Sequence, residues 1–210
     1  MSIPKRFPRA QLAQLIEHNR DWIERSLADL EASIPECYRQ WPPSILPLDA
    51  IGVQMVLNYE DELHLPAQSN VSGVTLGCSI AAPVSDRLAV AHEISLHLKK
   101  IARKTLPGLL ASHAHLHGFS YKRVTIRGQR TVWGSYSSSG TVSLNYKLLF
   151  LQRELVDYVL LHELVHTVHQ NHSKAFWTLL GTLNVNARTL DRRLRDAAKR
   201  VPPWLELTYR

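Results

Sequence analysis

The spacing of apolar residues predicts a helix near the start of the chain and strands after it. Over residues 11–30 apolar side chains recur every three or four positions, the period of an amphipathic helix. A proline-rich stretch, WPPSILP at residues 41–47, then predicts a linker. In IGVQMVLNYE (residues 51–60) and GVTLGCSI (residues 73–80) apolar and polar residues alternate, which predicts two strands.

The middle of the chain predicts two consecutive helices. Asp86 can cap a helix that runs to about Lys104, and Pro107 can begin a second helix that ends at Gly118. Proline is favoured in the first turn of a helix and glycine just beyond the last, so we expect a break between the two helices.

The second half predicts strands followed by helices. Apolar residues alternate with polar ones at Val124 and Ile126 and again from Val142 to Tyr146, which predicts two strands. The SSSG stretch between them predicts a hairpin turn with Gly140 at the position of positive φ. Helical spacing then returns over about residues 152–170, from Ser173, and over about residues 188–199. Strands grouped before helices indicate an α+β fold. We expect an N-terminal helical and β region at 1–118, a second domain at 119–201 and a C-terminal tail at 202–210.

The first of these helices carries the motif H-E-x-x-H, formed by His162, Glu163 and His166. Residues four apart on a helix differ by about 40° in direction, so both imidazoles can bind one ion. Glu163 points about 100° away, from where it can reach a water on the ion without binding the ion itself. A zinc ion with three protein ligands lowers the pKa of its water to about 7, and the glutamate can take up the proton.

A third ligand must come from elsewhere in the chain. His172 is favoured if Asn171 ends the helix, because a turn there would bring His172 back toward His162. His169 points in nearly the same direction as His162 but lies about 10 Å further along the axis. Asp191 is a more distant alternative.

Two other histidine groups have less suitable spacing. His92 and His97 are five residues apart, which places them about 140° apart on a helix, so they cannot share an ion. His113 and His117 are four apart but lack an adjacent glutamate. We expect neither group to be the metal site.

Composition and charge limit the class of protein. The formal net charge is +7 with histidine neutral, which suits a nucleic acid or another anionic partner as well as a solvated basic surface. The basic residues form a stripe on the last helix and a group before the hairpin: Arg188, Arg192, Arg195 and Lys199, with Lys122, Arg123, Arg127 and Arg130.

Three further features suggest a cytoplasmic protein. No apolar run approaches the roughly 18 residues that span a bilayer, so no membrane contact is expected. The N-terminus lacks the apolar segment of a secretory signal. Cys37 and Cys78 do not form a CxxC pair, and we expect both to be small core residues.

A longer stretch of sequence resembles the YgjP-like metallopeptidase family, a group of zincin-like predicted metal-dependent hydrolases. The resemblance is carried by TVWGSYSSSGTVSLNYKLLF (residues 131–150) and VDYVLLHELVHTVHQNHSKAFW (residues 156–177). The chain departs from the family pattern in having Tyr136 in place of a cysteine and Tyr146 in place of a tryptophan. A metzincin is disfavoured, since no methionine follows the histidines and His169 stands where that group has glycine.

The resemblance implies a zincin-like catalytic domain, a small antiparallel sheet beside an active-site helix. It also implies one catalytic zinc bound by His162, His166 and His172, with Glu163 as the base of a peptidase. Alternatives are a metal-dependent nucleotide phosphohydrolase, a DNA-associated protease, and a basic nucleic-acid-binding module with structural zinc. The strand at 141–147 is our expected edge for an extended peptide, with Asn145 and Tyr136 as possible contacts, and Trp133, Phe176 and Trp177 are expected in the core.

Overall fold

The computed structural model describes residues 12–60 and 74–209, which fall into two compact units, residues 1–35 and residues 36–210. The described part of the first unit holds α1 (Leu12–His18) and α2 (Arg20–Ser33). The single helix predicted here is therefore interrupted. The interruption is at Asn19, whose side chain donates to the carbonyl oxygen of Leu15 at 2.8 Å, the same oxygen that accepts from its backbone amide.

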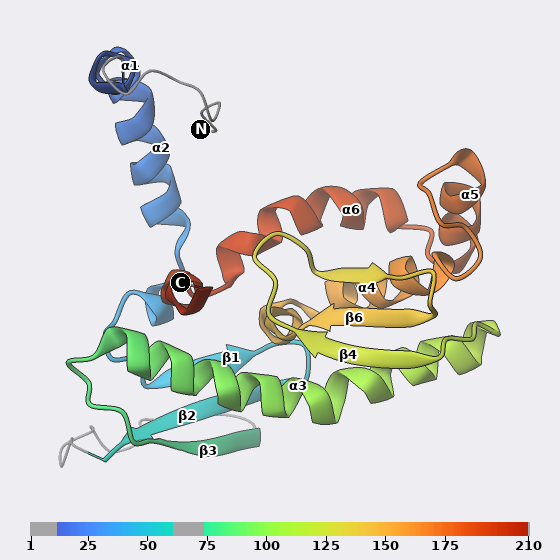
Figure 1. Cartoon of the computed structure of the whole chain (residues 1–210), viewed down its shortest axis with the longest axis horizontal. Coiled ribbons are helices and arrows are strands. Elements are labelled where there is room, and N and C mark those ends of the chain that lie inside the picture. Colours follow the sequence, from blue (N-terminus) through green and yellow to red (C-terminus); the bar gives the residue numbers. More distant parts are fainter. Residues whose placement is uncertain (1–11, 61–73, 210) are drawn as a thin grey trace. The chain divides into compact units, whose positions relative to one another are not determined.

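The second unit begins with a three-stranded sheet, the first sheet (Figure 1). Its strands are β1 (Ile45–Leu48), β2 (Val53–Tyr59) and β3 (Val74–Ile80) in that order, with β1 antiparallel and β3 parallel to β2. The two predicted strands are confirmed. The predicted linker instead contributes β1, an edge strand, where proline is tolerated because one side of the strand needs no hydrogen-bond donor.

Helix α3 runs from Arg87 to His117 without a break, so the prediction of two helices is wrong. Its ends are as expected, because Asp86 accepts hydrogen bonds from two backbone amides and Gly118 has φ 71°. Pro107 costs about 3 kcal/mol in a helix interior. Leu106 and Leu110 on either side of it are fully buried, and each such burial contributes about 1.5–3 kcal/mol, so packing outweighs the proline.

The second sheet has the order β4 (Arg123–Arg127), β6 (Thr141–Asn145), β5 (Gly134–Tyr136). The SSSG turn is confirmed, with Gly140 at φ 83°, but it joins β5 to β6, whereas β4 pairs parallel with β6. The strand expected at the edge is therefore central. It also ends at Asn145, after which Tyr146–Phe150 forms a short 3₁₀ helix, η3. The edge beside α4 is β5.

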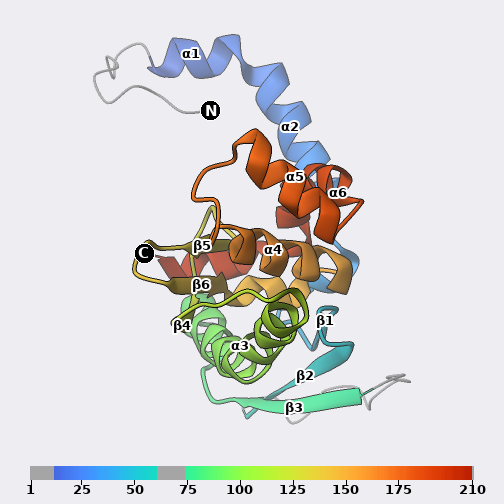
Figure 2. The ribbon, with the colours of Figure 1, turned by 90° about the vertical axis from the view of Figure 1, so that its right-hand side faces the viewer.

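Three helices and short 3₁₀ segments complete the unit. Figure 2 shows α4 (Arg153–Val165) on one side of the second sheet, with α5 (Lys174–Leu183) and α6 (Ala187–Asp196) beyond it. The other 3₁₀ segments among the described residues are η2 (Glu36–Tyr38), η4 (Ala197–Arg200) and η5 (Pro203–Tyr209). Gly118, at the expected boundary of the catalytic domain, joins α3 to β4 inside this one unit.

The expected α+β class is confirmed, since the strands form two small separate sheets and are not wound alternately with helices. Cys78 is buried and free, and the side chain of Cys37 lies outside the described residues. None of the helices in the described ranges is long and apolar enough to cross a bilayer.

Candidate metal centre

The end of α4 brings three histidines together. The helix ends at Val165, about five residues before the predicted end, and the amide of His166 bonds to the carbonyl oxygen of His162. The chain then turns, and Ser173 caps α5 by accepting from the amide of Phe176, as predicted. This turn returns His172 to α4, so that its Nε2 lies 2.9 Å from Nε2 of His162.

One potential ligand atom from each of His162, His166 and His172, here called the histidine cluster, lies within 4.8 Å of the others. In the described part of the chain no other group of three His, Cys, Asp or Glu side chains meets in this way. The alternatives are placed elsewhere. His169 contributes only its carbonyl oxygen, which lies 2.9 Å from Nδ1 of His166, and Asp191 lies outside the cluster.

Hydrogen bonds fix which ring nitrogen faces the centre of the cluster. A carbonyl oxygen only accepts, so Nδ1 of His166 carries the proton that it donates to His169, and Nε2 keeps a lone pair. Tyr158 donates its hydroxyl proton to Asp191 at 3.0 Å, so Nδ1 of His162, 3.4 Å from that hydroxyl, must be the donor to it. Two unprotonated Nε2 atoms thus converge on one point, which suits a cation.

Burial keeps these rings neutral. The pKa of His162 is lowered to about 4, first by burial and then by the neighbouring His166 and His172. Burial also lowers the pKa of His166, although the hydrogen bond to His169 opposes this. Neutral imidazole is the form that binds a metal ion.

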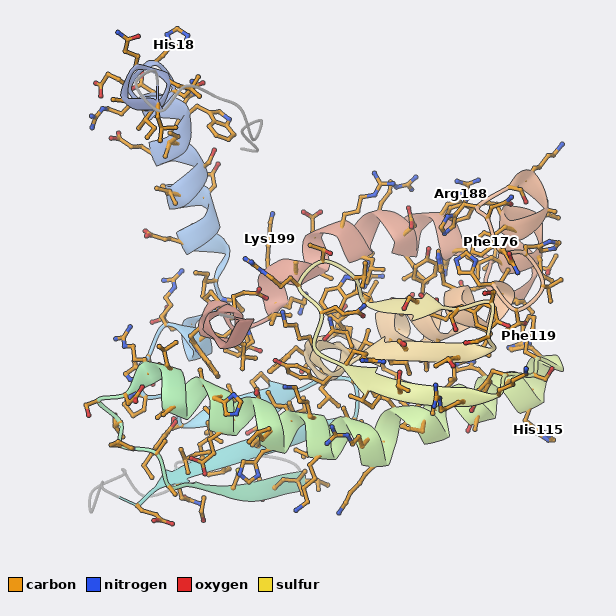
Figure 3. All side chains as sticks on the ribbon, viewed as in Figure 1. His18, His115, Phe119, Phe176, Arg188 and Lys199 are labelled. Carbon is orange, nitrogen blue, oxygen red and sulfur yellow. The ribbon has the colours of Figure 1, made fainter. Side chains whose placement is uncertain are left out.

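Phe176 forms an apolar wall against the cluster. Its ring centroid lies 4.9, 4.7 and 4.8 Å from those of His162, His166 and His172, and its side chain is fully buried, as predicted (labelled in Figure 3). The two tryptophans expected in the core, Trp133 and Trp177, are only partly buried.

Glu163 is held beside the cluster in an unusual environment. Its side chain is buried, Oε2 has no hydrogen-bond partner among the described residues, and burial raises the pKa of the carboxyl group to about 8. On its other side is Gly134 of β5, where an added Cβ would lie 2.7 Å from Oε1 of Glu163. Glycine is needed there because the backbone of β5 approaches this carboxyl group so closely.

A cavity of about 370 Å³ opens over these groups. Besides the cluster and Glu163, it is lined by Gly134, Ser135, Tyr136, Ser138 and Gln170. Tyr136, an expected substrate contact, therefore borders the cavity. Asn145, the other expected contact, is buried and donates two hydrogen bonds to the carbonyl oxygens of Gln129 and Val132, so it fixes the loop before β5.

Three residues of this site were not predicted from the sequence: Gly134, Tyr158 and Asp191 in its role as acceptor. Tyr158 precedes His162 by four residues on α4, so helical spacing could have indicated it. Gly134 and Asp191 reach the site only through pairing of distant segments, for which no local signal exists.

Comparison with known proteins places this geometry in context. A family model described as "YgjP-like, metallopeptidase domain" matches residues 1–197. No curated protein matches the chain. Among solved structures, the metallopeptidase zymogen abylysin of Pyrococcus abyssi is similar to part of it, with 26% identity over 44% of this chain and 93% of that chain and a TM-score of 0.40.

Proposed function

Because the chain belongs to the YgjP-like metallopeptidase family, we propose that it is a zinc-dependent peptidase. In this proposal His162, His166 and His172 bind one zinc ion and Glu163 is the general base. The observation that carries the proposal is the convergence of imidazole nitrogens on one point, with a buried carboxyl group next to them. A bound zinc ion would supply a Lewis acid that polarises the scissile carbonyl group and acidifies water.

Glu163 supports hydrolysis through the atom that lacks a partner. A cation bound by the three histidines would favour the ionised form of this carboxyl group. In that form Oε2 would accept a proton from the attacking water and pass it to the amine that leaves, which is general base and then general acid catalysis. Phe176 and the buried end of α4 keep bulk water from the back of the site. A purely structural ion would have no use for this carboxyl group.

The edge strand β5 suits an extended peptide. Trp133 accepts a hydrogen bond from Asn145, and Ser137 donates one to Thr141, so these residues of the strand and its turn pair inward with β6. In an antiparallel pair the alternate residues point their backbone groups the other way, so Gly134 and Tyr136 present theirs at the open edge. A substrate backbone that adds to this edge would pass directly over Glu163.

The cavity favours a peptide over a nucleoside triphosphate, since its lining residues within the described chain include no Lys or Arg. Purified protein loaded with zinc should cleave an unfolded protein or a fluorogenic peptide library, lose this activity with 1,10-phenanthroline and regain it with zinc. Nucleoside triphosphates in parallel should release no phosphate. Phosphate release without peptide cleavage would reverse the assignment.

Substitution Gly134→Ala should impair catalysis without loss of metal. The new Cβ would lie 2.7 Å from Oε1 and 2.8 Å from Cγ of Glu163, so the carboxyl group must move. A displacement of about 1 Å at a catalytic group can cost roughly 100-fold in rate, and we expect a fall in kcat of that order. Gly181→Ala on α5, where an added Cβ meets nothing within 4 Å, is the matched control. Unchanged kcat in Gly134→Ala would contradict the role of Glu163.

Tyr158 and Asp191 should act as positioning residues for the metal. Tyr158→Phe removes the oxygen that receives the Nδ1 proton of His162, and Asp191→Asn weakens the bond that orients this oxygen. Loss of such outer contacts typically costs about 10–100-fold in metal affinity. Competition with a chelating dye measures this directly. Asp196→Asn is the control on the same helix, because Asp196 pairs only with Lys199 among the described residues, and it should bind zinc like the wild type. Equal zinc affinities in all variants would refute the positioning role of Tyr158 and Asp191.

A further inference from the structure

A long segment of the chain has no carboxylate at all. Residues 94–153, sixty in succession, contain no Asp or Glu but ten basic residues: Lys99, Lys100, Arg103, Lys104, Lys122, Arg123, Arg127, Arg130, Lys147 and Arg153. Elsewhere acidic residues are common, since the whole chain has 18. The segment covers most of α3 and the entire second sheet, so its positive charge is concentrated on these elements.

Helix α3 exposes part of this charge along one arc. Around the helix axis, an arc of about 140° contains the side chains of Lys99, Arg103, Lys100 and Lys104, in that order. Lys100, Arg103 and Lys104 are exposed, while the opposite side of the helix is core. Figure 3 shows the full course of α3, with His115 marking its C-terminal end.

Strand β4 adds two arginines next to this helix. The hydroxyl groups of Thr125 and Ser143 bond at 3.0 Å, which shows that both side chains are on one face of the second sheet. Arg123 and Arg127 alternate with Val124 and Ile126, so they share that face with Thr125, and both are exposed. The opposite face carries Gly134 and meets Glu163.

Lys99 connects the helix to the strand. Its ammonium group lies 5.5 Å from the ring centroid of Tyr146, and its Cε lies 3.4 Å from the position of a Cβ on Gly128, the residue after β4. The pKa of Lys99 is lowered first by burial and then by Arg103. The repulsion between these two neighbours is what a surface without counter-charges produces.

The basic stripe predicted on the last helix is different, because three of its four residues have a charged or aromatic partner. Arg195 pairs with Asp191 and Lys199 pairs with Asp196, and the guanidinium of Arg188 stacks 3.6 Å from the ring centroid of Trp177 (Arg188 and Lys199 are labelled in Figure 3). By contrast, within the described ranges no ion pair involves any of the six α3 and β4 residues, which we call the basic face: Lys99, Lys100, Arg103, Lys104, Arg123 and Arg127.

We propose that the basic face binds double-stranded nucleic acid through its phosphates. A duplex carries one negative charge per about 1.7 Å of axis, which complements a face of unpaired cations on rigid elements. Residues 92–104 of α3 include no Phe, Tyr or Trp, so the helix offers no platform for stacking single-stranded bases, and only Leu96 is a large exposed apolar residue there, too little for insertion into a membrane. Binding without sequence preference follows, since phosphate contacts carry no sequence information.

The site of binding is separate from the metal centre. Arg123 and Arg127 are on the face of the second sheet opposite to the one that meets Glu163, so a duplex on the basic face leaves the cavity open. The proposal therefore does not depend on peptidase activity. Glu163→Gln should bind nucleic acid like the wild type, and the failure of either proposal can be recognised without the other.

Fluorescence anisotropy with two labelled 25-base-pair duplexes of unrelated sequence tests the proposal on the full chain. Both should bind equally, and log K should fall with log salt concentration with a slope of up to about −5, the value for six phosphate contacts. Lys100→Glu with Arg103→Glu should lower affinity at least tenfold and reduce the slope by about 2. Circular dichroism and zinc content establish that the variant is folded.

A control with the same change in charge is Arg192→Glu with Lys199→Glu on and after α6, which should keep more than half of the wild-type affinity. Equal loss in both double variants would mean that net charge alone drives binding, and it would overturn the proposal. So would the absence of binding at 50 mM salt. Vesicles with and without phosphatidylserine form the last arm, and binding to anionic vesicles but not to duplexes would assign the face to a membrane instead.

Discussion

Glu163→Gln is expected to abolish peptide hydrolysis while zinc remains bound. The amide has the shape of the carboxyl group but cannot accept a proton, and general base catalysis typically contributes about 100- to 10,000-fold to the rate. Glu163 is 5% exposed, and it is the only carboxyl group among the described residues that line the cavity. We expect kcat to fall by at least 100-fold. Steady-state kinetics with metal analysis of the same samples measures both quantities.

Two comparisons make this result specific. Glu154→Gln is the same substitution on the same helix, at an exposed residue whose only ion-pair partner among the described residues is Arg193, and it should keep the activity of the wild type. Glu163→Gln should also keep a zinc affinity within a factor of about three of the wild type, since the glutamate is not a ligand in the proposal. Retention of more than a tenth of the activity would show that another group is the base.

The part of the site that depends on local signals could be predicted from the sequence. The i, i+4 spacing of His162 and His166 fixes their direction on any helix, and Ser173 identifies the start of α5 through its capping hydrogen bond. Together these two signals require a turn between the helices, and the turn returns His172 to His162. Each step needs only neighbours in sequence.

The strand order could not be predicted, because alternation gives the faces of a strand but not its neighbours. The strands that contain Val124 and Val142 show the same alternation and do pair, but they run in parallel. The hairpin partner of β6 is instead Gly134–Tyr136, and a strand of three residues is too short to show an alternating pattern. Because β5 could not be predicted, the contact between Gly134 and Glu163 could not be predicted either. Gly134 is next to Glu163 only because β5 is the strand that forms the edge.

The prediction of two helices in place of α3 failed for a different reason. Pro107 is a valid local signal for a helix start, but the apolar residues on both sides of it are buried against the same core. Sequence alone does not reveal that a common partner surface exists. Burial of long-range contacts therefore overrode a local rule, and the continuous helix is what carries the basic face along β4.

His166→Ala should remove zinc from the protein. Two imidazoles would remain, and the loss of a direct ligand should exceed the roughly 10–100-fold in affinity that a lost outer contact costs. A ligand that binds only the native state at about 100 times its dissociation constant stabilises it by about 2.7 kcal/mol. Added zinc should therefore raise the melting temperature of the wild type but not that of His166→Ala. This readout needs no substrate, so it tests the metal site independently of peptide cleavage.

His92→Ala is the matched control, since His92 is exposed on α3 next to a glutamate and stands five residues before His97, a spacing that cannot hold one ion. It should bind zinc in the same amount as the wild type and show the same rise in melting temperature. The strongest challenge is the double variant His162→Ala with His166→Ala. If it kept one zinc per chain, the ion would have to bind elsewhere, because His172 alone supplies one ligand where a structural or catalytic zinc site requires at least three.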